Sequence, residues 1–169
     1  VLIPVYNERD TIRQCIDAVL KADTRNLELE VIISDNNSND GTKEILSKIQ
    51  DKQIKILYRD SNNGKGANIK NALANATGDL ILFQDGDLEY SPKDFPDLIE
   101  PFFLYRADVV YGSRLTRAKA TSIVGFPNYI ANIIVTFLTN VLYNKVFTDI
   151  ATGYKVFKSD VIKNLKITS

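Results

Sequence analysis

The chain has 169 residues, which is enough for one hydrophobic core of ordinary domain size. Hydrophobic residues make up 44% of it and charged residues 25%, as is typical of a globular protein, and 21 basic residues balance 21 acidic ones. This balance gives no indication of a nucleic-acid partner. The complete absence of histidine excludes Ser–His–Asp, Cys–His and histidine-rich zinc sites.

The single cysteine, Cys15, cannot form an internal disulfide, and we expect it to pack as a small apolar residue on a helix. The sequence has no signal peptide and no uninterrupted apolar run of about 18 residues, the length expected of a membrane-spanning helix. It begins inside an apolar segment and contains no Met. We therefore expect residues 1–169 to form a single domain that is a fragment of a longer chain.

Short apolar runs predict strands at residues 1–5, 29–34, 54–58, 80–83 and 107–111. Helical spacing of apolar side chains predicts a helix over residues 12–20, preceded by a possible cap at Asn7. Further helices are predicted around residues 45–49, at 67–76 and at 95–105. Strands that alternate with helices through short loops are typical of βαβ units, so the sequence predicts an α/β fold with a doubly wound, mainly parallel sheet.

The loops that leave the predicted strands are all polar. They cover residues 6–8, 35–41, 62–66 and 85–89, and each contributes acidic residues, Gly or Lys. Sheets of this kind bind ligands outside the carboxyl ends of their strands. The sequence therefore predicts one ligand-binding crevice built from several loops.

The stretch 79–92 carries the most specific chemistry. A buried strand, Leu80–Phe83, is followed by Asp85, Asp87 and Glu89, which would repel one another without a cation among them. Carboxylate oxygens suit Mg²⁺ or Mn²⁺, and Gly86 is expected to allow a sharp turn that lets Asp85 and Asp87 converge. We predict a metal site here; the alternative is an acidic surface turn.

Lys65 lies between Gly64 and Gly66, at the start of a predicted helix. The segment is not a P-loop, because Gly rather than Ser or Thr follows the lysine, and it lacks the third small residue of a Rossmann fingerprint. A lysine at a helix N-terminus is a plausible neighbour for a phosphate group. The alternative is a flexible turn with a solvated lysine.

Residues 120–144 contain no Lys, Arg, Asp or Glu, yet Asn or Thr recurs at every fourth position from Asn128 to Asn144. This spacing predicts a helix with a polar stripe and an otherwise apolar surface, flanked by basic residues. Because the Asn residues interrupt the apolar run, a spanning helix is disfavoured. We favour a membrane-interfacial helix within residues 120–146, and a buried core helix is the alternative.

Several motifs occur in a characteristic order along the chain. They are Ile3-Pro4-Val5-Tyr6-Asn7-Glu8, Asp35-Asn36-Asn37-Ser38-Asn39-Asp40-Gly41-Thr42, Asn63-Gly64-Lys65-Gly66, Asp85-Gly86-Asp87-Leu88-Glu89, Tyr111-Gly112-Ser113-Arg114, and Thr148-Asp149 through Thr152-Gly153-Tyr154-Lys155. Together they resemble the family 2 glycosyltransferases of the GT-A fold. The last two motifs are most similar to the dolichyl- or polyprenyl-phosphate mannosyltransferases. The resemblance covers essentially the whole chain.

The resemblance implies roles for the donor-binding residues. Asp85 and Asp87 would ligate the metal on the donor diphosphate, with Glu89 completing the coordination. Asp35 would hold the base or ribose. The residues expected to line the nucleotide base pocket are Pro4, Tyr6 and Glu8. Two positions depart from the family pattern: Asn36 stands where many relatives have a second Asp, and Gly86 replaces the usual Ala.

The same resemblance implies a function. We expect a single catalytic domain that transfers a sugar with inversion, in the presence of Mg²⁺ or Mn²⁺, to dolichyl or polyprenyl phosphate at the cytoplasmic face of a membrane. Mannose from GDP-mannose is the favoured donor and UDP-glucose a possible one. The alternatives are a family 2 enzyme with a soluble or polysaccharide acceptor, and a sugar-nucleotide-binding module without catalysis.

The acceptor side is expected to need positive charge rather than a general base, because a phosphate monoester is already mostly ionised at pH 7. Arg114 and Lys155 are the residues expected to hold that phosphate. Asp149 is expected to orient the cation of Lys155 rather than accept a proton, the alternative being that it caps a local turn. With Asp87, these are the residues on which we expect catalysis to depend.

Overall fold

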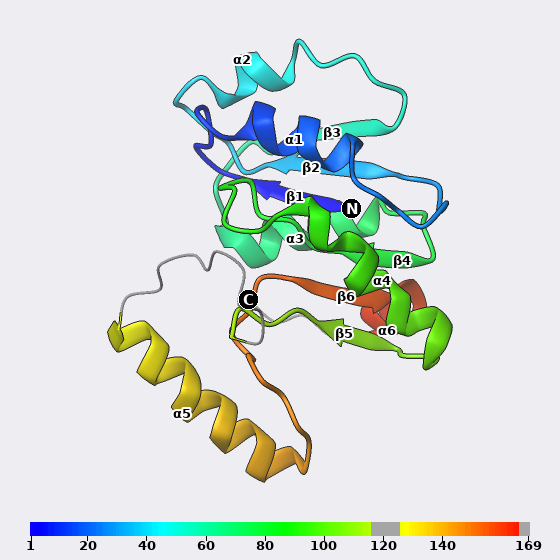
Figure 1. The fold of residues 1–169 in the computed structure, drawn as a ribbon. Coiled ribbons are helices and arrows are strands. Elements are labelled where there is room, and N and C mark those ends of the chain that lie inside the picture. Colours follow the sequence, from blue (N-terminus) through cyan, green and yellow to red (C-terminus); the bar gives the residue numbers. More distant parts are fainter. Residues whose placement is uncertain (116–125, 166–169) are drawn as a thin grey trace.

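The computed structural model of the chain describes residues 1–115 and 126–165. Figure 1 shows the arrangement of its helices and strands. The strands are β1 (Leu2–Val5), β2 (Val31–Asp35), β3 (Ile54–Tyr58), β4 (Leu80–Leu82), β5 (Val109–Tyr111) and β6 (Lys155–Lys158). The helices are α1 (Ile12–Leu20), α2 (Thr42–Leu46), α3 (Gly64–Ala74), α4 (Phe95–Leu104), α5 (Phe126–Tyr143) and α6 (Ser159–Asn164), and a 3₁₀ turn covers Pro92–Asp94.

The strands form two parts of one layer. Strands β1, β2 and β3 pair in parallel, and β6 pairs antiparallel with both β4 and β5. A parallel bridge between Leu2 and Phe83, with a hydrogen bond from Gln84 N to Leu2 O (3.0 Å), joins β1 to the end of β4. Of the described strands only β6 runs against the others, so the predicted α/β fold with a mainly parallel sheet is confirmed.

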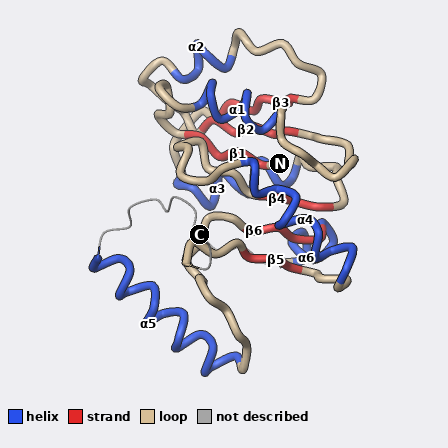
Figure 2. Tube along the Cα trace, in the orientation of Figure 1, coloured by secondary structure: helices blue, strands red, loops and turns tan. Residues whose placement is uncertain are grey.

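Alternating residues of the central strands supply two separate cores. Ile3, Val5, Val31 and Ile33 point to one face, where α1 and α4 pack, whereas Leu2 and Ile32 point to the other. The second face is covered by apolar residues of α3 and α6, among them Ala72, Leu73 and Ile162. Burial on both faces explains why the predicted strands read as continuous apolar runs. Figure 2 shows where the strands and helices lie along the chain.

Three boundaries differ from the prediction in ways that affect the site. Helix α3 begins at Gly64, so Lys65 lies in its first turn and not in a preceding loop. Strand β2 extends to Asp35, the first residue of the predicted loop. Asn7 does not cap α1, whose N-cap is Thr11; it has a φ of +57°, and its Oδ1 accepts from Asn39 N (3.0 Å).

Helix α5 stands apart from the rest of the fold in Figure 1. Asn132 and Thr136 are its buried residues, and Phe137, Val141 and Leu142 are 63%, 64% and 77% exposed. The alternative of a buried core helix is therefore wrong. The helix is shorter than the predicted 120–146 segment, because residues 144–146 follow its end and residues 116–125 lie outside the described part. Among residues 1–115 and 126–165, no helix combines the length and the hydropathy that crossing a membrane requires.

Candidate active site

A cavity of about 320 Å³ lies where the carboxyl ends of β1, β2 and β4 meet the start of α3, as predicted for the strand-exit loops. Its volume is in the range of small-molecule sites. The residues that line it are Pro4, Val5, Tyr6, Glu8, Asn36, Asn62, Gly64, Lys65, Asn68, Asp85, Gly86 and Asp87. The polar loops that follow β1, β2, β3 and β4 thus contribute to one crevice.

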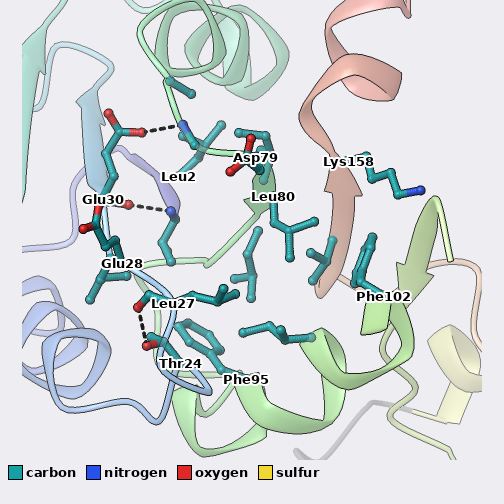
Figure 3. Close-up of a pocket in the computed structure, with 18 of the residues that line it drawn as sticks. Leu2, Thr24, Leu27, Glu28, Glu30, Asp79, Leu80, Phe95, Phe102 and Lys158 are labelled. Carbon is teal, nitrogen blue, oxygen red and sulfur yellow. Dashed lines mark hydrogen bonds between the residues drawn. The ribbon is translucent and has the colours of Figure 1, made fainter. Parts of the chain in front are cut away.

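A larger cavity of about 710 Å³ lies at the opposite edge, where β1 and β4 begin (Figure 3). Its walls are mainly apolar and include Leu80, Phe95 and Phe102. The carboxylate of Glu30, which also lines this cavity, accepts hydrogen bonds from Thr77 N (2.9 Å) and Thr77 Oγ1 (2.8 Å). Sheets of this kind bind ligands at the carboxyl ends of their strands, which is the other edge. The smaller cavity lies at that edge and is lined by acidic, amide and lysine side chains, so we take it as the candidate active site.

The first and second strand-exit loops are tied together by backbone-to-side-chain hydrogen bonds. Asn7 N donates to Ser38 Oγ (2.9 Å), and Glu8 N donates to Thr42 Oγ1 (2.9 Å). The carboxylate of Glu8 accepts from Thr11 Oγ1 (2.7 Å), which fixes its direction at the cavity wall. Pro4, Tyr6 and Glu8 therefore reach the cavity on a loop held in place from both sides.

Asp35 does not line the cavity, although the sequence predicted that it would hold the base or ribose. It is fully buried at the end of β2, where its Oδ2 accepts from Ser38 N (3.1 Å). Its Oδ1 has no hydrogen-bond partner within the described part of the chain, which is uncommon for a buried carboxylate. A contact between Asp35 and a donor stays a prediction, and this oxygen is the atom that could make it.

Asn36 lines the cavity instead, at the position where the sequence departs from its family pattern. Its Nδ2 donates to Asn62 Oδ1 (2.6 Å) and, at longer range, to Gly64 O (3.4 Å). A carboxylate has no N–H to donate, so an Asp could not make these bonds. The Asn36 side chain thus connects the end of β2 to the first turn of α3. This contact was not predicted from the sequence.

A buried polar contact holds α3 against the strand exits. Asn68 Oδ1 accepts from Ser34 Oγ (2.5 Å), and Asn68 Nδ2 donates to Ser34 O (2.7 Å). Both side chains are buried, so each satisfies polar groups that would be costly to leave unpaired. This contact fixes the α3 N-terminus and with it Lys65, whose Nζ lies 2.6 Å from Asp85 Oδ1.

Asp85 and Asp87 both reach the cavity, but the turn between them differs from the prediction. Gly86 does not have a positive φ; the left-handed residue is Leu88, with φ of +64°. Asp87 Oδ1 accepts from Glu89 N (3.0 Å), which closes the turn. A non-glycine residue in this conformation costs roughly 1–2 kcal/mol, so the surrounding structure holds the loop in shape.

Glu89 does not line the cavity, and no group of three described acidic or cysteine side chains is arranged to hold a metal ion. The turn at Leu88 separates Glu89 from the aspartates. Its charge acts on Arg114, where it contributes to a raised guanidinium pKa, after the larger effect of the hydrogen bonds to Asp149. The predicted convergence of three carboxylates is therefore absent from the described part of the structure.

Asp85 and Asp87 by themselves fit a divalent cation. Mg²⁺ is commonly bound through one or two carboxylates, with substrate phosphates supplying further oxygen ligands. Both aspartates face a cavity that is large enough for phosphates, and Lys65 already places a positive charge on Asp85. Asp85 and Asp87 therefore stay our predicted ligands for Mg²⁺ or Mn²⁺, with Glu89 as the least supported member of that set.

A buried network behind Asp85 was not predicted. Gln84 is fully buried; its Nε2 donates to Asp85 O (2.9 Å), and its Oε1 accepts from the Tyr154 hydroxyl (2.7 Å). Burial raises the pKa of Tyr154, which keeps this hydroxyl protonated as a donor. The Tyr90 hydroxyl accepts from Gly153 N (2.7 Å), and its ring packs 4.6 Å from that of Tyr154. The network thus connects the Asp85 loop to the chain segment that precedes β6.

Arg114 and Asp149 form an ion pair with several hydrogen bonds. Arg114 Nε lies 2.8 Å from Asp149 Oδ2, its Nη2 lies 3.0 Å from Oδ1, and its backbone N also donates to Oδ2 (3.1 Å). These bonds, together with one from Asn132, lower the pKa of the buried Asp149 carboxyl below its ordinary value despite desolvation. Asp149 therefore orients Arg114, whereas the sequence predicted Lys155 as its partner.

Lys155 begins β6, with its Nζ 5.1 Å from the centre of the Tyr111 ring. Burial lowers its pKa from the ordinary value, and the nearby charges of Lys65 and Arg114 lower it further, against the opposing effect of Asp149 and Asp85. Lys65 and Arg114 therefore both lie close enough to Lys155 to act on its charge. Such a group is suited to an anionic ligand.

The sequence matches the profile of a known protein family. A profile of "Glycosyl transferase family 2" matches residues 1–166. The dodecaprenyl-phosphate galacturonate synthase of Rhizobium johnstonii is 25% identical over 171 residues, which cover 99% of this chain and 49% of that protein. An uncharacterized protein of Methanocaldococcus jannaschii is 27% identical over 98% of this chain and 73% of its own length.

Solved structures show the same fold. The glucosyl-3-phosphoglycerate synthase of Mycobacterium tuberculosis has a TM-score of 0.72 at 21% identity, covering 97% of this chain and 58% of that one. A mannosyltransferase from Pyrobaculum calidifontis, solved with GDP-Man and Mn²⁺, has a TM-score of 0.67 at 20% identity, covering 99% of this chain and 46% of that one. The chain thus spans about half the length of these two proteins and of the Rhizobium enzyme. Because the profile covers nearly the whole sequence and the fold agrees, the chain belongs to glycosyl transferase family 2.

Proposed function

We propose that this chain is the catalytic domain of a metal-dependent, inverting glycosyltransferase that moves a sugar from a nucleotide donor to a polyprenyl or dolichyl phosphate. The observation that carries the proposal is the group of Lys65, Arg114 and Lys155 around Asp85 and Asp149. This group lies next to α5, which bonds to Asp149 through its polar side and exposes its apolar side. An anionic head and a long apolar tail are the two chemical features that this arrangement suits.

On the donor side, the nucleotide would occupy the cavity between the loop of Tyr6 and Glu8 and the start of α3, with Asp35 contributing its unpartnered oxygen. Asp85 and Asp87 would hold Mg²⁺ or Mn²⁺ at the diphosphate, where the ion would supply the positive charge that a leaving diphosphate needs. Lys65, in the first turn of α3, is placed to add a second positive charge there.

On the acceptor side, Arg114 and Lys155 would hold the lipid phosphate. The phosphate brings its own negative oxygen to the reaction, so the protein's task is to position it and to offset its charge. Asp149 is unsuited to proton abstraction, because its two oxygens already accept four hydrogen bonds, three from Arg114 and one from Asn132. A carboxylate offers about four acceptor positions, so none is left for a substrate proton.

The test of this proposal is a transfer assay with a panel of labelled donors, including GDP-mannose, UDP-glucose and UDP-galacturonate. Dolichyl phosphate and undecaprenyl phosphate in detergent or vesicles are offered in parallel with phosphoglycerate as a soluble acceptor. We expect labelled sugar to be transferred to the lipid phosphate, so that the product extracts into organic solvent. The transfer should require Mn²⁺ or Mg²⁺, and mannose should be the favoured sugar. Efficient transfer to phosphoglycerate with none to either lipid would favour the soluble-acceptor alternative.

The apolar side of α5 leads to a separate prediction about the membrane surface. Phe137→Asp is expected to weaken binding to vesicles of phosphatidylcholine and phosphatidylglycerol about tenfold or more, because a large apolar side chain is replaced by a charge. Donor affinity and melting temperature should stay close to those of the unchanged protein, since the side chain is 63% exposed. Vesicle sedimentation and a melting curve measure the two effects.

Phe103→Asp is the matched control, because Phe103 is 60% exposed on α4, a different helix. Equal vesicle affinity for the Phe137 variant and the unchanged protein would contradict a lipid partner for α5. The apolar side would then belong to an interface with another protein segment.

A further inference from the structure

The polar side of α5 faces the Arg114–Asp149 pair. Of the 18 residues in this helix, Asn132 and Thr136 are the buried ones, at 8% and 7% exposure. They lie one turn apart on the same side, opposite the exposed apolar residues. A helix that buries Asn and Thr and exposes Ile, Leu and Phe has its polarity reversed relative to an ordinary surface helix.

Hydrogen bonds from this side hold the helix to the segment before β6. Asn132 Nδ2 donates to Asp149 Oδ1 (2.8 Å), and the Asn132 amide oxygen accepts from Thr136 Oγ1 (3.3 Å). Thr136 Oγ1 in turn accepts from Ile150 N (3.2 Å), and Asn140 Oδ1 accepts from Phe147 N (2.7 Å). Three consecutive turns of α5 are therefore bonded to residues 147–150.

Among the described residues, Asn132 supplies the hydrogen bond to Asp149 that does not come from Arg114. Asp149 Oδ2 accepts from Arg114 N and Nε, and Oδ1 accepts from Arg114 Nη2 and Asn132 Nδ2. Without Asn132, one lone pair of a side chain that is fully inaccessible to water loses its donor. An unsatisfied position of this kind is costly, and rotation of the carboxylate to recover it would move the guanidinium bonded to it.

We propose that Asn132 is a positioning residue for the acceptor phosphate: by completing the hydrogen bonding of Asp149 it fixes the direction of the Arg114 guanidinium. Helix α5 is thereby part of the acceptor site and not solely a surface for lipid. The proposal rests on the proposed function, because it assigns the Arg114 guanidinium to the acceptor phosphate.

The experiment measures binding of farnesyl phosphate by calorimetry, together with the KM values for donor and lipid phosphate in the transfer assay. Asn132→Leu removes the donated hydrogen bond while keeping the branched shape of the side chain. We expect the dissociation constant for farnesyl phosphate and the acceptor KM to rise about tenfold, with the donor KM unchanged. Asn128→Leu is the matched control: it makes the same change one turn earlier on α5, where the side chain is exposed.

A double-mutant cycle separates positioning from a structural effect. If Asn132 acts through Arg114, Asn132→Leu should add little to the loss already caused by Arg114→Gln, because the guanidinium that it positions is gone. Losses that add fully, or an Asn132 variant that behaves like Asn128→Leu, would overturn the positioning role. If the unchanged protein binds farnesyl phosphate but transfers no sugar to lipid, the proposed function is wrong. The calorimetric comparison of the Asn132 and Asn128 variants then still tests the role of Asn132. If farnesyl phosphate does not bind at all, both proposals are wrong.

Discussion

Replacing Asp87 by Asn is expected to lower kcat/KM by about 10³-fold, corresponding to roughly 4 kcal/mol of transition-state stabilisation. Asp87 lines the cavity with Asp85, and its loss would leave one carboxylate there for a divalent cation. The amide keeps the size of the side chain and its Oδ1, which accepts from Glu89 N, so the turn should survive. The measurement is donor turnover across a range of Mn²⁺ concentrations.

The matched control for this change is Asp10→Asn. The Asp10 side chain is 85% exposed, and its ion pair is with its neighbour Arg9, so its replacement should leave turnover within about twofold. Unchanged turnover of Asp87→Asn in the presence of a chelator would show that no metal acts through this aspartate.

Gly153→Ala should lower kcat/KM about 10²-fold while leaving the protein folded. A Cβ at this position would lie 2.7 Å from Tyr90 Cε2 and 2.8 Å from Asp85 Oδ2, so the aspartate or the tyrosine must move. A displacement of about 1 Å at a reacting centre can cost this much. Movement of Asp85 should appear in the donor KM and in the Mn²⁺ dependence, because Asp85 is a predicted metal ligand.

Gly78→Ala provides the comparison, since its Cβ would meet ordinary contacts of 3.7 Å and 3.9 Å. Both variants are to be compared by melting temperature and by initial rates. If Gly153→Ala keeps full activity and the same Mn²⁺ dependence, the position of Asp85 is not set by its packing against Gly153.

The strand-exit crevice could be predicted because two signals agree in the sequence. Buried parallel strands are continuous apolar runs, and the polar residues that follow them must gather at one edge of the sheet. Tyr6, Glu8, Lys65, Asp85 and Asp87 were found in this way, and all five line the cavity. Strand β6 gave no such signal, because its four residues begin and end with lysine.

The support of the site could not be predicted, because it depends on contacts between distant parts of the chain. Gln84 and Tyr154 are 70 residues apart, and Asn132 meets Asp149 across the turn after α5. The spacing of Asn and Thr in that helix predicts a polar stripe, but it does not predict whether the stripe faces the protein or the solvent. The apolar side proved to be outward because Asp149 and the 147–150 backbone supply partners for the polar side.

The position of Glu89 shows the limit of a spacing argument. Three carboxylates within five residues at the end of a buried strand, with a turn expected at Gly86, predicted one metal site. The positive φ lies instead at Leu88, and no local propensity signals it, because leucine rarely adopts this conformation.

The ion pair of Arg114 bears on the pH dependence of the reaction. The folded pKa of Asp149 is lowered below its unfolded value, so the pair's contribution to stability is present above the unfolded pKa and is lost as pH falls through the folded pKa. Acceptor binding by Arg114 should therefore be intact from mildly acidic pH upward. A change in rate near neutral pH must then come from another group.

In the proposed reaction, the attacking oxygen belongs to a phosphate anion, and no protein base removes a proton from it. The most direct test is the pH–rate profile with polyprenyl phosphate, repeated with a polyprenyl phosphonate of higher pKa. We predict that the rate rises through the acceptor's second pKa, about 6 for the phosphate, then reaches a plateau, and that the whole profile moves with the phosphonate. A profile that stays fixed when the acceptor pKa changes would contradict the claim and identify a protein group as the base.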